Sequence, residues 1–111
     1  MKNEAPKPGK PVRGSATGRP IMAALDLLGR RGALRILWEL RAGEALTFRA
    51  LASAAELSPA TLNVRLRELR DTGIVELEEG YRLTQLGGAL IVALTPLHAW
   101  SVQWARRARG A

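Results

Sequence analysis

The stretch 57-LSPATLNVRLRELRDTGIV-75 decides the fold of this chain. Ser58 followed by Pro59 predicts the start of a helix, because a serine oxygen caps free backbone amides and proline needs no N–H at the first helical position. Gly73, directly after Thr72, predicts its end. The sequence therefore predicts a helix over residues 58–72.

This helix has two chemically different faces. Leu62, Leu66 and Leu69 fall at positions i, i+4 and i+7, which commits that face to a hydrophobic core. The opposite face is small near its start and then increasingly polar and basic: it carries Ala60, Asn63, Val64 and Arg67, flanked by Thr61, Arg65 and Arg70.

Three shorter helices are predicted before residue 57. Pro20 begins the first, which Gly29 ends. The second covers residues 32–42 and is apolar nearly all round, which is typical of a central helix. Thr47 is a suitable N-cap for the third, whose buried side would be formed by Phe48, Leu51, Ala52 and Ala55.

After residue 73 the apolar period changes from helical to alternating. Residues 74–78 and 81–83 alternate with period two around Glu79-Gly80, which predicts a short β-hairpin. A last helix is predicted from Thr84 to about Arg107. Its apolar stripe has a period of 3.5 and suits a helix–helix seam: Leu86, Leu90, Ala93, Leu97, Trp100 and Trp104.

The order of elements predicts a mainly α fold with a small two-stranded antiparallel wing: a winged helix-turn-helix followed by a long C-terminal dimerisation helix. Residues 1–19, rich in proline and glycine, are expected to form a disordered basic arm. Residues 20–85 are expected to form the DNA-binding domain. Residues 86–111 are expected to supply the dimerisation helix and a basic tail.

The net charge of +7 is concentrated at the two ends of the 111-residue chain. Residues 1–19 hold five basic side chains and one acidic one, and residues 106–111 hold three arginines. Between them, nine arginines balance nine acids. Basic arms on a neutral body suit a polyanionic partner, although solvated tails that aid solubility would have the same composition.

Several functional classes are excluded or disfavoured. The chain has no cysteine, so disulfides, thiolate metal sites and thiol redox chemistry are excluded. No enzymatic motif is present, and we expect no catalysis, no cofactor and no metal site at the lone His98. The longest apolar run, residues 89–94, is too short to span a bilayer, and no signal peptide is visible. We therefore expect a cytoplasmic, nucleoid-associated protein without a membrane segment.

Residues 57–75 resemble the winged-helix repressors of bacteria and archaea, especially the HxlR type. Further segments resemble successive landmarks of that family, so that the likeness covers about residues 20–105: Pro20 with 24-ALDLLG-29, 36-ILWEL-40, 48-FRAL-51 and 83-LTQLG-87. The resemblance implies a prokaryotic, homodimeric DNA-binding transcription regulator, paired through its first and last helices.

Two features depart from the family pattern. Where that pattern has an oxidant-sensing cysteine before the first proline, this chain has Arg19, so a signal must enter by another route. The wing is shorter than usual and acidic, with Glu76, Glu78 and Glu79 against Arg82. Phosphates would repel such a wing.

The expected DNA contacts centre on the helix 58–72 in the major groove. Asn63 and Arg67 are expected to read base edges, since an amide pairs with adenine and a guanidinium with guanine. The other expected contacts, mostly to phosphates, are Arg49, Ser58, Ala60, Thr61, Val64, Arg65 and Arg82, with Lys2, Lys7, Lys10 and Arg13 from the arm. The alternative is a solvated face on which Arg65 pairs with Glu68 or Asp71.

The dimer interface is expected along the first and last helices, at Ile21, Leu25, Leu90, Leu94, Leu97, Trp100 and Trp104. Trp38, Trp100 and Trp104 could instead form an aromatic effector pocket, although such residues more often form core or interface. A small-molecule effector, if one exists, would bind between the last helix and the base of the wing.

A second hypothesis comes from a different class. A winged-helix module could bind another protein through its acidic hairpin, with the tails serving solubility alone. The acidic wing favours this hypothesis, whereas the polar face with Asn63 and Arg67 favours DNA.

Overall fold

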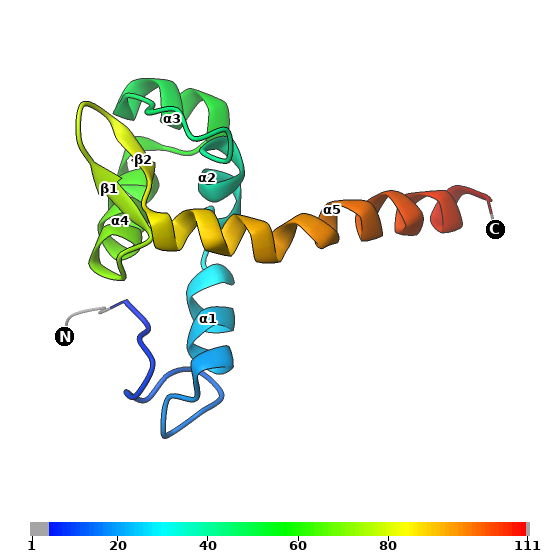
Figure 1. The fold of residues 1–111 in the computed structure, drawn as a ribbon, viewed down its shortest axis with the longest axis horizontal. Helices are drawn as coiled ribbons and strands as arrows, with labels where there is room; N and C mark the ends of the chain where they lie inside the picture. Colours follow the sequence, from blue (N-terminus) through cyan, green and yellow to red (C-terminus); the bar gives the residue numbers. More distant parts are fainter. Residues whose placement is uncertain (1–4, 111) are drawn as a thin grey trace.

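Five helices and one β-hairpin follow one another in the structure, a computed structural model that describes residues 5–110 (Figure 1). The two strands pair antiparallel, and the predicted fold class is confirmed. The elements are α1 (Pro20–Leu28), α2 (Ala33–Glu39), α3 (Phe48–Ala55), α4 (Pro59–Asp71), β1 (Val75–Leu77), β2 (Tyr81–Leu83) and α5 (Gln85–Gly110).

The core forms around α2, as its apolar sequence predicted. Ile36 and Leu37 are fully buried, and α3 contributes Leu51. The predicted inner face of α4 is confirmed, because its three leucines lie in the same cluster at 2% exposure or less: Leu62, Leu66 and Leu69.

The helix-turn-helix unit begins each of its helices with the predicted cap. The Thr47 hydroxyl accepts a hydrogen bond from the Ala50 amide at 3.0 Å, and the Ser58 hydroxyl accepts one from the Thr61 amide at 3.2 Å. Between the helices, Glu56 takes a left-handed backbone conformation with φ of 57° and turns the chain. These hydrogen bonds to the capping residues fix where α3 and α4 begin.

The wing is a short hairpin with a third chain segment beside it. Val75 pairs with Leu83, and Leu77 pairs with Tyr81. Tyr81 also exchanges two backbone hydrogen bonds with Leu46, at 2.7 and 2.9 Å. The sequence did not predict this bridge, because one isolated paired residue produces no alternating pattern.

Helix α5 starts inside the body and leaves it. Thr84 caps it by accepting from the Gly87 amide at 3.0 Å, and Leu90 and Ile91 pack against the core. The rest of the helix runs far beyond the other elements (Figure 1). The first turns of α5 are therefore part of the same core as residues 20–85, and the helix does not form a separate layer.

By length and composition alone, α5 could also cross a membrane, with a mean hydropathy of 1.2 over its most apolar window. One helix of this kind is weak evidence for a membrane span. The expectation that the chain has no membrane segment stays a prediction.

Residues 5–18 differ from the expected disordered arm. They form consecutive turns in which the Gly9 amide donates to the Gly18 carbonyl at 2.9 Å, and Ala5 and Pro6 are buried. The Arg13 amide donates to Asp26 of α1 at 3.1 Å. Composition measures the apolar surface that a segment can bury, and it does not capture backbone hydrogen bonds of this kind.

Alanine substitutions at the two adjacent glycines at the start of α5 should change the free energy of unfolding in opposite directions. A Cβ on Gly87 would collide with the Ile74 carbonyl, whereas a Cβ on Gly88 would meet nothing within 4 Å. In urea denaturation we expect Gly87→Ala to lower the free energy of unfolding by about 1–3 kcal/mol. Gly88→Ala should raise it by about 0.5–1 kcal/mol, because alanine is the better helix former. Equal stability of the two variants would contradict this account of the junction.

Candidate nucleic-acid interface

The outward face of α4 is open to solvent. Ala60, Asn63, Val64 and Arg67 are all exposed, and the apolar Val64 is 37% exposed. Within residues 5–110, Arg67 makes no ion pair, so its guanidinium is available to an external partner. Because the opposite face is fixed in the core, these side chains cannot turn inward.

Two further arginines of the helix-turn-helix unit are exposed, one on α3 and one near the end of α4. Arg49 is exposed in the first turn of α3, and Arg70 is exposed near the end of α4. Neither makes an ion pair in the part of the chain that the structure describes. Ser58 is exposed and Thr61 half-buried, and their hydroxyls bond to each other at 3.1 Å.

Arg65 lies in a different environment from Arg67. Its Nη1 donates to Oε1 of Glu68 at 2.7 Å, and its Nε donates to the Arg31 carbonyl at 2.8 Å. The side chain is only 18% exposed. The structure thus contains one of the two offset pairs that the sequence allowed, together with a bond to Arg31 that sequence spacing could not reveal.

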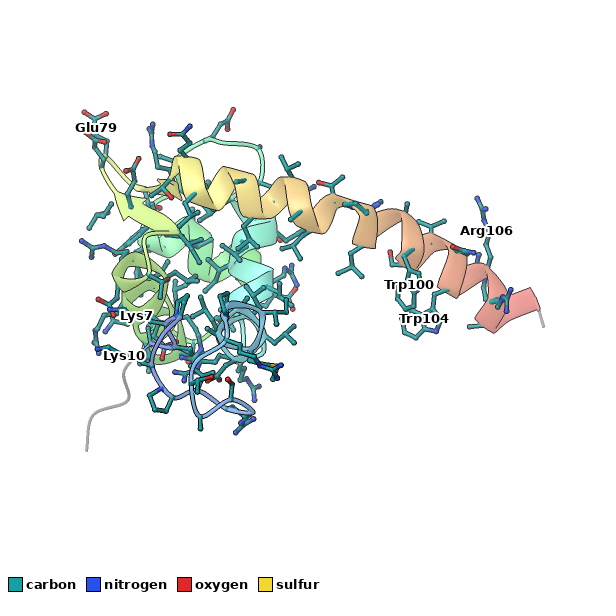
Figure 2. The ribbon with its side chains drawn as sticks, turned by 60° about the horizontal axis from the view of Figure 1, so that its bottom comes forward. Lys7, Lys10, Glu79, Trp100, Trp104 and Arg106 are labelled. Carbon is teal, nitrogen blue, oxygen red and sulfur yellow. The ribbon has the colours of Figure 1, made fainter. Side chains whose placement is uncertain are left out.

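The wing places few positive charges near α4. Arg82 stands opposite Glu76 in the strand register and is half-buried, and its Nε is buried with no partner among the described residues. Glu78 and Glu79 are exposed, and Figure 2 shows Glu79 at the tip of the hairpin. The wing tip is acidic, as the sequence indicated.

The basic arm runs along the same side of the molecule as α4. Nζ of Lys7 lies 3.0 Å from Oδ2 of Asp71, at the end of α4. Lys7 and Lys10 both lie on this side of the body in Figure 2. Lys2 lies outside the described residues.

A second large exposed surface is apolar and lies on α1 and α5. Most of the expected interface residues are at least half exposed: Ile21, Leu25, Leu97, Trp100 and Trp104, at 62, 54, 52, 52 and 61%. The other two are more buried. Leu90 packs against the core of its own chain, and Leu94 lines a groove of about 550 Å³ between α2 and α5.

The three tryptophans do not form one pocket. Trp100 and Trp104 stack on each other with ring centroids 5.4 Å apart. Trp38 stacks on His98 of α5 at 5.7 Å, and the Arg41 guanidinium lies 3.9 Å from the centre of the Trp38 ring. Within residues 5–110, no three histidine, aspartate or glutamate side chains gather as metal ligands.

An apolar cavity of about 390 Å³ lies where α1, the base of the wing and α5 meet. Its lining includes Ala24 and Leu27 of α1, Ile74 before the wing, and Leu86 of α5. Pro8 of the arm contributes to one side. The cavity is thus close to the place expected for an effector.

Comparisons with known proteins agree with this arrangement. A family model described as a helix-turn-helix domain matches residues 28–78, from the end of α1 into the wing. The crystal structure of the quinone-bound YodB from B. subtilis is similar, with a TM-score of 0.69 and 32% sequence identity. The similarity covers 75% of this chain and 96% of YodB. No curated protein matches the chain.

Proposed function

Because this chain belongs to the winged helix-turn-helix DNA-binding regulators, the family of YodB, we propose that it is a cytoplasmic transcriptional repressor that binds operator DNA as a homodimer. Within that family we assign it to the HxlR type, on the landmarks in residues 20–87. One observation carries the proposal. Helix α4 has its leucine face fixed in the core and its opposite, polar face exposed.

Helix α4 has the dimensions and side chains for the major groove. An α-helix fits a groove about 12 Å wide. Asn63 and Arg67 are four residues apart and therefore lie one above the other on the same face. Ala60 and Val64, also four residues apart, form a neighbouring row of short side chains that would let the backbone approach the bases. We expect the exposed Arg49 and Ser58, in the first turn of α3 and at the N-cap of α4, to contact phosphates.

Arg67→Ala should weaken discrimination between DNA sequences. A selection from random duplexes, followed by sequencing, is expected to enrich inverted repeats for the wild type. We expect Arg67→Ala to lose about 1–3 kcal/mol of preference for the selected sequence over random DNA, if the contact is bidentate. Arg70→Ala is the control, because it removes an arginine from the edge of the face and should weaken cognate and random binding alike.

An equal loss on cognate and random DNA for Arg67→Ala would refute its role in base recognition. An absence of any enrichment at low salt would refute DNA recognition and favour the alternative, a module that binds protein. The exposed acidic wing tip, with Glu78 and Glu79, would then be its docking surface.

A homodimer accounts for the exposed apolar surface of α1 and α5. Large apolar side chains exposed along two helices usually mark an interface. Trp100 and Trp104, stacked and more than half exposed, are the aromatic residues that typically anchor such contacts. Pairing of two copies through α5 would present two α4 helices to successive major grooves of a pseudo-palindromic site.

Leu97→Glu should convert the dimer to a monomer, because it places a charge in the middle of the apolar face of α5. Sedimentation velocity on the wild type and the variant measures this directly. Leu77→Glu is the matched control, since Leu77 is similarly exposed, at 48%, but lies on the wing. A monomeric wild type, or a Leu97→Glu variant as dimeric as the control, would contradict the proposed interface.

We propose the cavity between α1, Ile74 and α5 as the effector site. Its lining is apolar, which suits an uncharged aromatic compound. YodB is described as quinone-bound. This chain has no cysteine, so a quinone would be held here by apolar contact and not as a thiol adduct.

The cavity makes a specific prediction for ligand binding. 2-Methyl-1,4-naphthoquinone should raise the melting temperature of the wild type in a concentration-dependent way. Ala24→Phe should fill the cavity and remove this shift, whereas Ala50→Phe, on the exposed side of α3, should keep it. If all three proteins respond equally, the compound binds elsewhere and the cavity is not the effector site.

A further inference from the structure

Glu68 is the only charged side chain that is buried among the described residues, with 5% exposure. It lies on α4, beside the outward face. Its Oε2 accepts a hydrogen bond from Nη1 of Arg30, and its Oε1 accepts one from Nη1 of Arg65, both at 2.7 Å. Both oxygens of the carboxylate therefore have an arginine partner.

These bonds tie α4 to the loop between α1 and α2. Arg30 lies in that loop and approaches Asp26 of α1 at 3.7 Å. Arg65 donates a second bond from its Nε to the carbonyl of Arg31, the next loop residue, at 2.8 Å. We call the set Arg30, Glu68 and Arg65 the Glu68 clamp.

The leucines of α4 and the clamp constrain the helix differently. Apolar burial is non-directional, so Leu62, Leu66 and Leu69 fix how deeply α4 sits but tolerate small rotations and shifts. Charge-assisted hydrogen bonds to a guanidinium have a defined geometry. Because desolvation offsets much of the gain from a buried ion pair, the effect of the clamp lies more in direction than in stability.

We propose that the Glu68 clamp is a specificity-determining device that sets the angle of α4 relative to α1. This inference rests on the proposed function, in which α1 and α5 form the dimer interface. Ile21 and Leu25 on α1 would then be fixed to the partner subunit. A fixed angle between α1 and α4 fixes the distance between the two recognition helices, and hence the spacing of half-sites that the dimer accepts.

In this account Arg65 is a positioning residue. The Nε and Nη1 atoms of Arg65 donate to protein acceptors. The exposed Arg67 has no ion-pair partner among the described residues. Arg65 would therefore act on DNA through the orientation of α4, without neutralising a phosphate. This revises the expectation from the sequence, which placed Arg65 at a phosphate.

The test compares the full-length wild type with Glu68→Gln and Arg30→Gln. Binding is measured on inverted repeats that share the selected half-sites and differ in the spacer by −2 to +2 base pairs. The wild type should prefer one spacer. Both variants should reduce that preference by about fivefold or more, while the base preference within each half-site stays unchanged.

Glu39→Gln is the matched control. Glu39 also pairs with an arginine, Arg35, at 2.9 Å, but both residues lie on α2, and the bond from Arg35 to the Ala54 carbonyl of α3 does not involve Glu39. This variant should keep the spacer preference of the wild type. Arg30→Gln decides the matter if Glu68→Gln fails to fold, because it removes the ion pair between Glu68 and the loop and leaves the bonds of Arg65 to Glu68 and to the Arg31 carbonyl in place.

The outcomes separate the clamp from the proposed function. If the wild type enriches no repeat, the proposed function fails. If the wild type discriminates between spacers and folded clamp variants keep the same ratios, the function stands and the inference is overturned. A uniform loss of affinity at every spacer, with ratios intact, indicates a merely structural role and also overturns it.

Discussion

The burial of three leucines on one side of α4 is the constraint on which the rest of the structure depends. Leu62, Leu66 and Leu69 lie in one cluster with the apolar residues of α2 and α3. Each fully buried leucine contributes about 1.5–3 kcal/mol, so turning α4 over would cost several such contributions. The polar face is therefore held outward by the core. It is presented to solvent on a rigid element, as a recognition surface requires.

Local signals in the sequence were sufficient for the helix-turn-helix unit. Ser58 and Pro59 were expected to start α4, and the structure confirms this start. The same is true of Thr47 for α3, because caps act within one helical turn. The bridge between Leu46 and Tyr81 and the bond between Arg30 and Glu68 join residues far apart in sequence. No periodicity records such contacts, so they could not be predicted.

In the candidate site, too, the local features could be predicted, whereas the contacts between residues far apart in sequence could not. The exposure of Asn63 and Arg67 follows from helical geometry and was predictable from the positions of the leucines. The different environments of Arg65 and Arg67 were not, since both are arginines near the same face. Arg65 points toward a loop whose position depends on how α1 packs. The tryptophans could be assigned to helices but not to partners, and only the structure brings Trp38 to His98.

The body of the chain, residues 20–105, is neutral overall, but not every charged side chain in it is paired. Of the nine acids in residues 20–105, Asp26, Glu39, Glu68 and Asp71 pair with basic side chains. Among residues 5–110, Arg49, Arg67 and Arg70 have no such partner. The acids without such a partner among the described residues are Glu44 and Glu56, which lie on either side of α3, and the three acids of the wing, Glu76, Glu78 and Glu79. In the proposed function, DNA that approaches along α4 would meet these arginines and avoid the acidic wing tip.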